Sequence, residues 1–411
     1  MPEILDRRIA APPRLVSAAG AGTSETDAPE APALLAPETL RRTLDETVEY
    51  VLATCDYERT DRLCPAHFEL FMTNPMSVAF GASGVALFLS RVAGEVPERM
   101  RRWMLDQPVT SELYAPGLFV GTSGIALALA EVGMVERGEE LMAEAYRSPL
   151  LFDEASLFHG AAGWGFASLW FWDRTGRQVY LDQAVRAAEH LVRSAEAEGE
   201  TRFWRVRSES RIHYGYGFGA SGVGLFLLHA HLRTGRDDLL SAAVQALEYD
   251  LANKLETTNG TTWLRYENDP LNYPYFVHGG AGVGAVVVRF ARELGGERYR
   301  AWADEIAGAL DMKWAVLPGL FDGLSGIAEL SLDMHELTGE PAYLARAHDQ
   351  AETVLWFRVA MPEGKAFPGR LLFKVSNDLG TGAAGIGLHL HRLLHPGPRL
   401  FVDLPLPRGD A

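Results

Sequence analysis

Two histidines of this 411-residue chain stand directly before glycines that open the same short pattern, Gly-x-x-Gly. They are His159, before Gly160-Ala-Ala-Gly163, and His278, before Gly279-Gly-Ala-Gly282. Imidazole is the side chain best suited to move a proton near neutral pH, and a well-placed general base contributes about 10²–10⁴ in rate. Because both histidines occupy equivalent positions of a repeated pattern, we predict that both are catalytic; the alternative is that each one caps the helix that follows it.

Two aspartates occupy similar places in later copies of the pattern. Asp322 directly precedes Gly323-Leu-Ser-Gly326, and Asp378 leads into Gly382-Ala-Ala-Gly385. A carboxylate at this point can act as an acid or base, and it can equally cap a helix by accepting from the free N–H groups of its first turn. Both roles remain open from the sequence, and we include both aspartates among the catalytic candidates.

The fourth copy follows a segment rich in aromatic side chains, Arg211-Ile-His-Tyr-Gly-Tyr-Gly-Phe-Gly219. Within it, His213 and Tyr214 are further catalytic candidates, because an imidazole or a phenol can donate a proton or hold a developing oxyanion. We predict that three other residues contact the substrate, although aromatic-rich segments also simply pack in cores. These three are Arg211, Tyr216 and Phe321.

The elements that must position these residues form a sevenfold repeat. Each copy of the Gly-x-x-Gly pattern is followed by a run that is apolar nearly all round, such as Val223-Gly-Leu-Phe-Leu-Leu228, which is typical of a buried helix. A glycine 13 residues after the pattern, as at Gly176, Gly235 and Gly339, indicates the end of that helix and a tight turn. The seven copies begin at Gly81, Gly121, Gly160, Gly219, Gly279, Gly323 and Gly382.

A second, amphipathic helix after each turn makes every repeat an αα-hairpin. Seven such hairpins predict an all-α, (α/α)7 toroid, a double ring of seven inner and seven outer helices with small hairpin insertions such as 261–265. We place the toroid at residues 37–405 and a disordered tail or linker at residues 1–36, which are rich in Ala, Pro, Ser and Thr. Inner-helix N-termini that meet at one end would offer N–H groups and positive dipoles to an anion.

Composition excludes several classes of function. A net charge of −16 argues against binding nucleic acid or an anionic membrane, and no apolar run approaches the ~20 residues of a membrane span. We therefore predict a cytoplasmic protein. Cys55 and Cys64 are too few for a disulfide scaffold, and Cys64-Pro-Ala-His67 is either half of a metal site or a pair of ordinary side chains.

The seven motifs resemble those of the lanthionine synthetase C-like family over residues 40–400. The resemblance implies a toroid that cyclises ribosomal peptides: a cysteine thiolate of the peptide adds to dehydroalanine or dehydrobutyrine and forms a thioether ring. Four segments carry most of the match: Phe158-His-Gly-Ala-Ala-Gly163, Phe276-Val-His-Gly-Gly-Ala-Gly282, Leu320-Phe-Asp-Gly-Leu-Ser-Gly326 and Asp378-Leu-Gly-Thr-Gly-Ala-Ala-Gly385.

The resemblance also implies that zinc is not a cofactor here. Zinc-dependent members of that family use a cysteine two residues before the fifth motif and a Cys-His pair directly before the sixth, where this chain has Val277, Phe321 and Asp322. The histidine and aspartate that accompany zinc in those members are replaced by Phe218 and Ser156. The pattern is most similar to the cyclase domain of class III lanthipeptide synthetases, which also lacks the zinc ligands.

These observations lead to three hypotheses about function. The first is a zinc-independent lanthipeptide cyclase that forms (methyl)lanthionine or labionin-type rings in a precursor peptide with a leader, beside separate kinase and lyase proteins or domains. The second is a degenerate scaffold that binds the precursor and those partners without catalysis. The third is a carbohydrate-active α/α-barrel, in which Asp322 and Asp378 would form the required carboxylate pair.

Overall fold

The computed structural model describes residues 34–206, 209–258 and 260–404. Most of the expected tail, residues 1–33, and residue 405 of the expected toroid lie outside the described residues. Residues 34–36 are described and precede the first helix without regular structure. None of the helices in the described ranges is long and apolar enough to cross a membrane.

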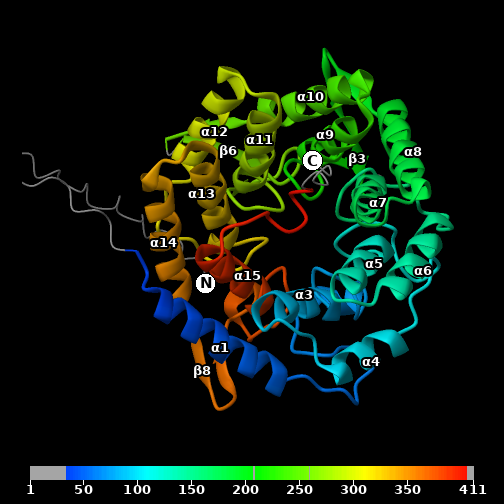
Figure 1. Ribbon diagram of the computed structural model, residues 1–411. Coiled ribbons are helices and arrows are strands. Elements are labelled where there is room, and N and C mark those ends of the chain that lie inside the picture. Colours follow the sequence, from blue (N-terminus) through cyan, green and yellow to red (C-terminus); the bar gives the residue numbers. More distant parts are fainter. Residues whose placement is uncertain (1–33, 207–208, 259, 405–411) are drawn as a thin grey trace, which may run out of the picture. The chain divides into compact units, whose positions relative to one another are not determined.

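Seven inner helices form a closed ring in the described part of the chain (Figure 1). Each begins directly after the first glycine of a repeat, which is its N-cap residue, and consecutive inner helices are in contact. The last inner helix contacts the first, which closes the ring. They are α3 (Ala82–Val92), α5 (Thr122–Glu131), α7 (Ala161–Thr175), α9 (Ala220–Thr234), α11 (Gly280–Leu294), α13 (Leu324–Thr338) and α15 (Ala383–Leu394).

Seven outer helices cover this ring, and the predicted (α/α)7 toroid is confirmed. Gly176, Gly235 and Gly339 end inner helices with φ values of 64°, 67° and 72°, as their spacing predicted. The first outer helix packs on the last inner one, so the two ends of the ring join there. The outer helices are α1 (Pro37–Ala53), α4 (Glu98–Asp106), α6 (Val135–Tyr146), α8 (Gln178–Ser194), α10 (Asp237–Ala252), α12 (Glu297–Ala309) and α14 (Pro341–Trp356).

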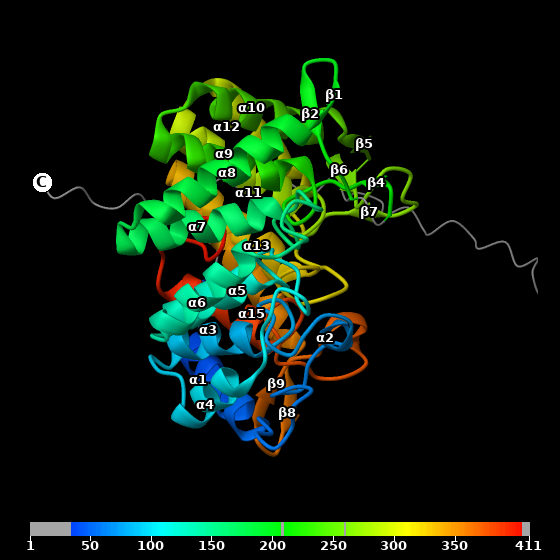
Figure 2. The same ribbon diagram turned by 90° about the vertical axis from the view of Figure 1, so that its right-hand side faces the viewer.

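Small antiparallel hairpins occupy the insertions between repeats, as expected, and the strand predicted over 261–265 is present as β6. Figure 2 shows β4 to β7 and the short helix α2 (Glu69–Met72) on the side of the ring where the inner helices begin, which we call the glycine face. The strands pair as β1 (Glu196–Glu198) with β2 (Thr201–Phe203), β3 (Arg205–Val206) with β4 (Arg211–Ile212), β5 (Leu255–Thr257) with β6 (Gly260–Leu264) and β7 (Asn272–Tyr273), and β8 (Val359–Met361) with β9 (Gly364–Ala366).

The last glycine of each motif is required by a close approach of the backbone. The loop before every inner helix folds back over the helix start, and the carbonyl oxygen six residues earlier would lie only 1.5–2.2 Å from a Cβ atom placed on that glycine. A side chain cannot fit there without moving the backbone. This contact recurs at Gly84, Gly124, Gly163, Gly222, Gly282, Gly326 and Gly385.

Replacing Gly124 by alanine should lower the free energy of unfolding by about 3 kcal/mol or more, because its Cβ would lie 1.5 Å from the Leu118 carbonyl oxygen. Urea denaturation followed by circular dichroism measures the loss. Gly308→Ala is the matched control: that glycine lies in α12, where a Cβ atom would meet no other group within 4 Å, so alanine should add about 0.5–1 kcal/mol. Equal effects at both sites would contradict the close-approach explanation.

The centre of the ring holds a C-terminal strap, residues 395–404, which crosses it in Figure 1. The Tyr216 hydroxyl of the fourth repeat donates to the Phe401 carbonyl oxygen at 2.5 Å, and His229 Nε2 lies 3.0 Å from the Val402 carbonyl oxygen. Asp403 pairs with Arg289 at 2.8 Å. The strap therefore joins α9, the loop before it and α11 from within the ring.

Candidate functional site

Three of the predicted catalytic residues, all histidines, gather around one aromatic ring on the glycine face. The imidazole of His278 stacks on Phe218, with ring centroids 4.9 Å apart and planes 3° apart. The rings of His159 and His213 lie 5.3 and 5.6 Å from the same phenyl ring, and those of His213 and His278 lie 5.6 Å apart. They come from the loops before α7, α9 and α11, so the ring of helices brings together side chains from three different repeats.

Burial keeps these histidines neutral. It lowers the pKa of His159 to about 4 and that of His278 to about 3. Burial also lowers the pKa of His213, but the carboxylate of Glu209, whose Oε2 lies 3.4 Å from His213 Nε2, acts in the opposite direction. Neutral imidazoles can accept protons, and His213 is the best suited of the three because it has a carboxylate partner.

A second polar group adjoins the histidines and centres on Arg370, at the start of the short 3-10 helix η1 (Arg370–Leu372). Its Nη1 lies 3.0 Å from Glu69 Oε1, and its Nε lies 3.6 Å from Asp322 Oδ2. Arg370 also contacts the hydroxyl of Tyr273, whose ring lies edge-on to His278 with centroids 6.2 Å apart. Tyr273 therefore links the guanidinium to the histidine cluster.

No sequence pattern singles out Arg370 or Glu209. Both lie in insertions between repeats, where no spacing rule applies. Asp322, one of the predicted catalytic residues, lies beside Arg370 as its ion-pair partner. Burial raises the pKa of Asp322, and the Arg370 guanidinium opposes that rise.

Asp378 occupies a capping position instead of joining the histidines. Its carboxylate accepts from the backbone N–H of Thr381 at 2.7 Å and of His67 at 3.1 Å, and from the hydroxyls of Ser376 and Thr381. The side chain is fully buried, and these bonds use its acceptor capacity. This geometry favours the capping alternative for Asp378, and a catalytic role for it stays an untested prediction.

The two tyrosines of the fourth loop point away from the histidine cluster. Tyr214 stacks on Tyr249 with its hydroxyl 3.4 Å from Asn253 Oδ1, toward the outer ring. Tyr216 is fully buried against the strap. Gly215, with φ of 95°, turns the chain between them and sends the two side chains in different directions. These positions support neither the catalytic role expected for Tyr214 nor the substrate contact expected for Tyr216.

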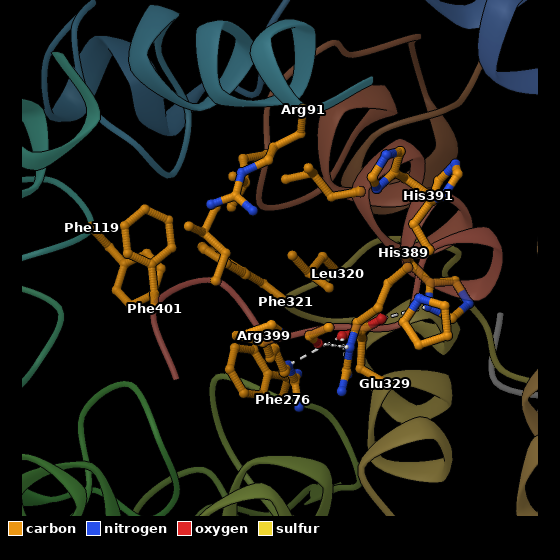
Figure 3. Close-up of a pocket in the computed structure, with 18 residues that line it drawn as sticks. Arg91, Phe119, Phe276, Leu320, Phe321, Glu329, His389, His391, Arg399 and Phe401 are labelled. Atoms are coloured by element: carbon orange, nitrogen blue, oxygen red, sulfur yellow. Dashed lines mark hydrogen bonds and ion pairs between the residues drawn. The ribbon is translucent and has the colours of Figure 1, made fainter. Parts of the chain in front are cut away.

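The other two expected substrate contacts, Arg211 and Phe321, lie in different places. Arg211 lies on the surface, with its guanidinium 4.4 Å from the centre of the Tyr266 ring and its Nη1 3.6 Å from Glu209 Oε2. Phe321 is buried and lines a cavity of about 320 Å³ that opens beside the strap. Figure 3 shows Phe119 and Phe401 on one side of this cavity and His391 on the other. The structure therefore places Arg211 beside the carboxylate partner of His213, whereas Phe321 lines the cavity at the strap.

The N–H groups at the start of the inner helices bond to their own loops. The N–H of Thr122 donates to Ala115 O at 2.8 Å, and the equivalent N–H of Ala161 donates to Glu154 O at the same distance. In α9, the Asp250 carboxylate accepts from the Ser221 N–H at 2.9 Å. The expectation that these groups are free to bind an anion is corrected, because the folded-back loops already use them.

The residues at the zinc-ligand positions of related proteins do not fit zinc. Val277 and Phe321 are buried and apolar, and Asp322 alone offers a single carboxylate where zinc takes about four nitrogen, sulfur or oxygen ligands. Cys64 and His67 gain no third ligand: across the described ranges, no three His, Cys, Asp or Glu side chains are arranged to hold a metal ion.

The carbohydrate-active alternative needs two free carboxylates on either side of a substrate. Asp322 is paired with Arg370 and Asp378 caps its loop, so the two candidates do not form such a pair. The chain does share its fold with an unsaturated glucuronyl hydrolase from Streptococcus agalactiae, with a TM-score of 0.50 and 11% identity over 88% of this chain and 92% of that chain. This similarity concerns the fold alone.

Other comparisons agree with the motifs. The chain is 28% identical over 378 residues to a probable SapB synthase from Streptomyces coelicolor, which covers 91% of this chain and 40% of that protein. This chain thus spans less than half the length of that relative. Nisin cyclase has the same fold, with a TM-score of 0.63 and 15% identity over 87% of this chain and 95% of that chain. A family model described as lanthionine synthetase C-like protein matches residues 72–406. Since that match covers most of the chain, this protein belongs to the lanthionine synthetase C-like family.

Proposed function

We propose that this protein is a zinc-independent lanthipeptide cyclase, similar to the cyclase domain of class III synthetases. Its substrate would be a dehydrated precursor peptide, and its products (methyl)lanthionine or labionin-type rings. The observation that carries the proposal is the cluster of neutral histidines around Phe218, on a lanthionine synthetase C-like scaffold whose residues do not fit zinc.

In the proposed reaction His213 acts as the base. Its imidazole takes the proton from a cysteine thiol of the peptide, and the sulfur forms a bond to the β-carbon of a dehydroalanine. The π electrons of the broken C=C double bond move onto the α-carbon and its carbonyl as an enolate. The imidazolium then returns the proton to the α-carbon, so atoms and charge balance without another reagent. Glu209, 3.4 Å from His213, would orient the imidazole and stabilise its charged form.

The enolate would be stabilised by Arg370. A fixed guanidinium in a partly buried position stabilises developing negative charge more strongly than water does. Arg370 is held by Glu69 and Asp322 and reaches His278 through Tyr273. It supplies the positive charge that the inner-helix N–H groups, being bonded to their own loops, do not.

The proposal is tested with a dehydrated precursor peptide incubated with the protein in excess chelator. Thiol addition leaves the peptide mass unchanged, so a thiol-capping reagent is added at the end and the capped thiols are counted by mass spectrometry. We expect the protein to remove thiols faster than a no-protein control, at a rate that differs by less than about twofold between chelator and added zinc. Activity that requires added zinc would contradict zinc independence.

The partners follow from the same proposal. A precursor with a leader peptide must first be phosphorylated and dehydrated, which requires kinase and lyase proteins or domains. The probable SapB synthase is more than twice as long as the segment it shares with this chain. If no thiols are lost from a peptide that a complete system cyclises, the scaffold alternative replaces the cyclase.

A further inference from the structure

Exposed apolar side chains gather in two segments of the glycine face. Met72, at the end of α2, is 79% exposed, and Phe373, directly after η1, is 87% exposed. Single exposed apolar residues are ordinary on protein surfaces, but six within two short segments are not. We call these six residues the apolar rim: Phe68, Phe71, Met72, Leu371, Leu372 and Phe373.

The two segments of the apolar rim are held side by side. The Arg370 guanidinium binds Glu69 at 3.0 Å, and the Asn377 N–H donates to the Pro65 carbonyl oxygen at 2.7 Å. Figure 2 shows α2 next to the chain segment that leads into α15. Arg370 and Asn377 stand before and after residues 371–373 and both bind the segment 65–69, so the two parts of the rim are neighbours on the glycine face.

The backbone keeps two of these side chains in solvent. Leu371 and Leu372 both have left-handed φ values, 66° and 60°, which residues other than glycine rarely adopt. Their side chains remain about half exposed instead of packing into the core. A strained turn that presents leucines to water is consistent with a surface that is covered during function.

The rim also carries positive charge in an otherwise acidic protein. The net charge of the chain is −16, yet Arg62 and Lys374 flank the rim and have no ion-pair partner within the described ranges. The Arg62 guanidinium lies 5.7 Å from the centre of the Phe71 ring, and Lys374 directly follows Phe373. A partner that fits this surface presents apolar side chains with Asp or Glu beside them.

We propose that the apolar rim binds an amphipathic, acidic segment of the precursor peptide that lies outside the residues to be cyclised. The inference rests on the proposed function for the identity of the peptide. Glu69 belongs to α2 and Arg370 directly precedes Leu371, and through Tyr273 this ion pair connects the rim to the histidine cluster. A peptide bound at the rim therefore delivers the residues that follow it to the proton-transfer groups, which raises their local concentration.

The test measures binding separately from chemistry. A fluorescently labelled, undehydrated precursor peptide is titrated with the full chain and followed by anisotropy. Phe71→Asp/Phe373→Asp should weaken binding by at least about tenfold, since two apolar anchors become charged. Lys374→Glu should weaken it by about threefold to fivefold, less so at high salt. Val179→Asp, at a 45% exposed residue in the first turn of α8, is the matched control and should bind as the wild type does.

Several outcomes would overturn the inference. One is a double variant that binds the peptide like the wild type; another is a wild-type protein that does not bind it. A third is a rim that joins two copies of this chain, seen as a dimer that the double variant dissolves while peptide affinity stays the same. If binding depends on the rim but no rings form, the inference stands and the cyclase proposal fails. Circular dichroism of each variant checks that the fold is intact.

Discussion

Replacing Arg289 by methionine should lower the free energy of unfolding by about 3–5 kcal/mol. The Arg289 guanidinium, 1% exposed, binds the carboxylates of Asp333 on α13 and Asp403 in the strap, at 2.8 Å to Asp403 Oδ2. Burial alone would raise the pKa of Asp333, but Arg289, Arg392 and Arg399 outweigh it and hold that pKa below its ordinary value. Methionine would fill the space and leave the buried carboxylates without their closest cation.

Arg292→Met is the matched control for this prediction. Arg292 lies one helical turn away on α11 and also binds Asp403, at 2.9 Å, but its side chain is 43% exposed. Partly solvated ion pairs contribute little, so the expected loss is about 1 kcal/mol or less. Urea titration of both variants measures the difference. Similar losses would show that burial of the network does not control its contribution.

The strap that this network holds was beyond prediction from sequence. Residues 395–404 contain no helical or strand period, and the ring itself accounts for all seven repeats without them. A weak signal did exist: Arg289 interrupts the apolar run of α11, and Asp333 interrupts that of α13. Charges of opposite sign inside buried helices must be paired, but the sequence does not say that a third segment joins them.

The toroid, in contrast, could be predicted almost completely. The Gly-x-x-Gly copies mark the start of every inner helix, and Gly176 and Gly235 mark the ends of α7 and α9. What the sequence could not supply was the reason for the last glycine in each motif. The repeat alone suggests that seven helix ends crowd one another, whereas the structure shows each loop folding back onto its own helix, as at Gly124 and Leu118.

The candidate site was predictable for residues whose position within the repeated motif fixes their place in the ring. His159 and His278 share one motif position, so they had to approach the same face of the ring. Tyr214 and Tyr216 were less predictable, because their directions depend on the left-handed turn at Gly215. Arg370 comes from an insertion whose return to the ring cannot be deduced from spacing.

Replacing His213 by glutamine should slow thiol addition by about 10²–10⁴-fold. Glutamine keeps a polar side chain of similar reach but cannot take a proton from the thiol. The rate is measured under single-turnover conditions in chelator, as thiols lost from the dehydrated peptide. His335→Gln, at a histidine of α13 whose Nδ1 lies 3.0 Å from the Glu340 carbonyl oxygen, is the control and should react like the wild type.

The pH profile separates a base from a residue that only supports the fold. Burial lowers the pKa of His213 below its ordinary value of 6.5, so the neutral, active form dominates at pH 7 and the rate falls only as pH drops through that lowered pKa. Glu209 raises this pKa, so Glu209→Gln should move the acid limb to lower pH and slow the reaction. The pH–rate profile of the His213→Gln variant should show no acid limb. If the acid limb is unchanged in both variants, another group transfers the proton. His159 and His278 are then the remaining histidines around Phe218.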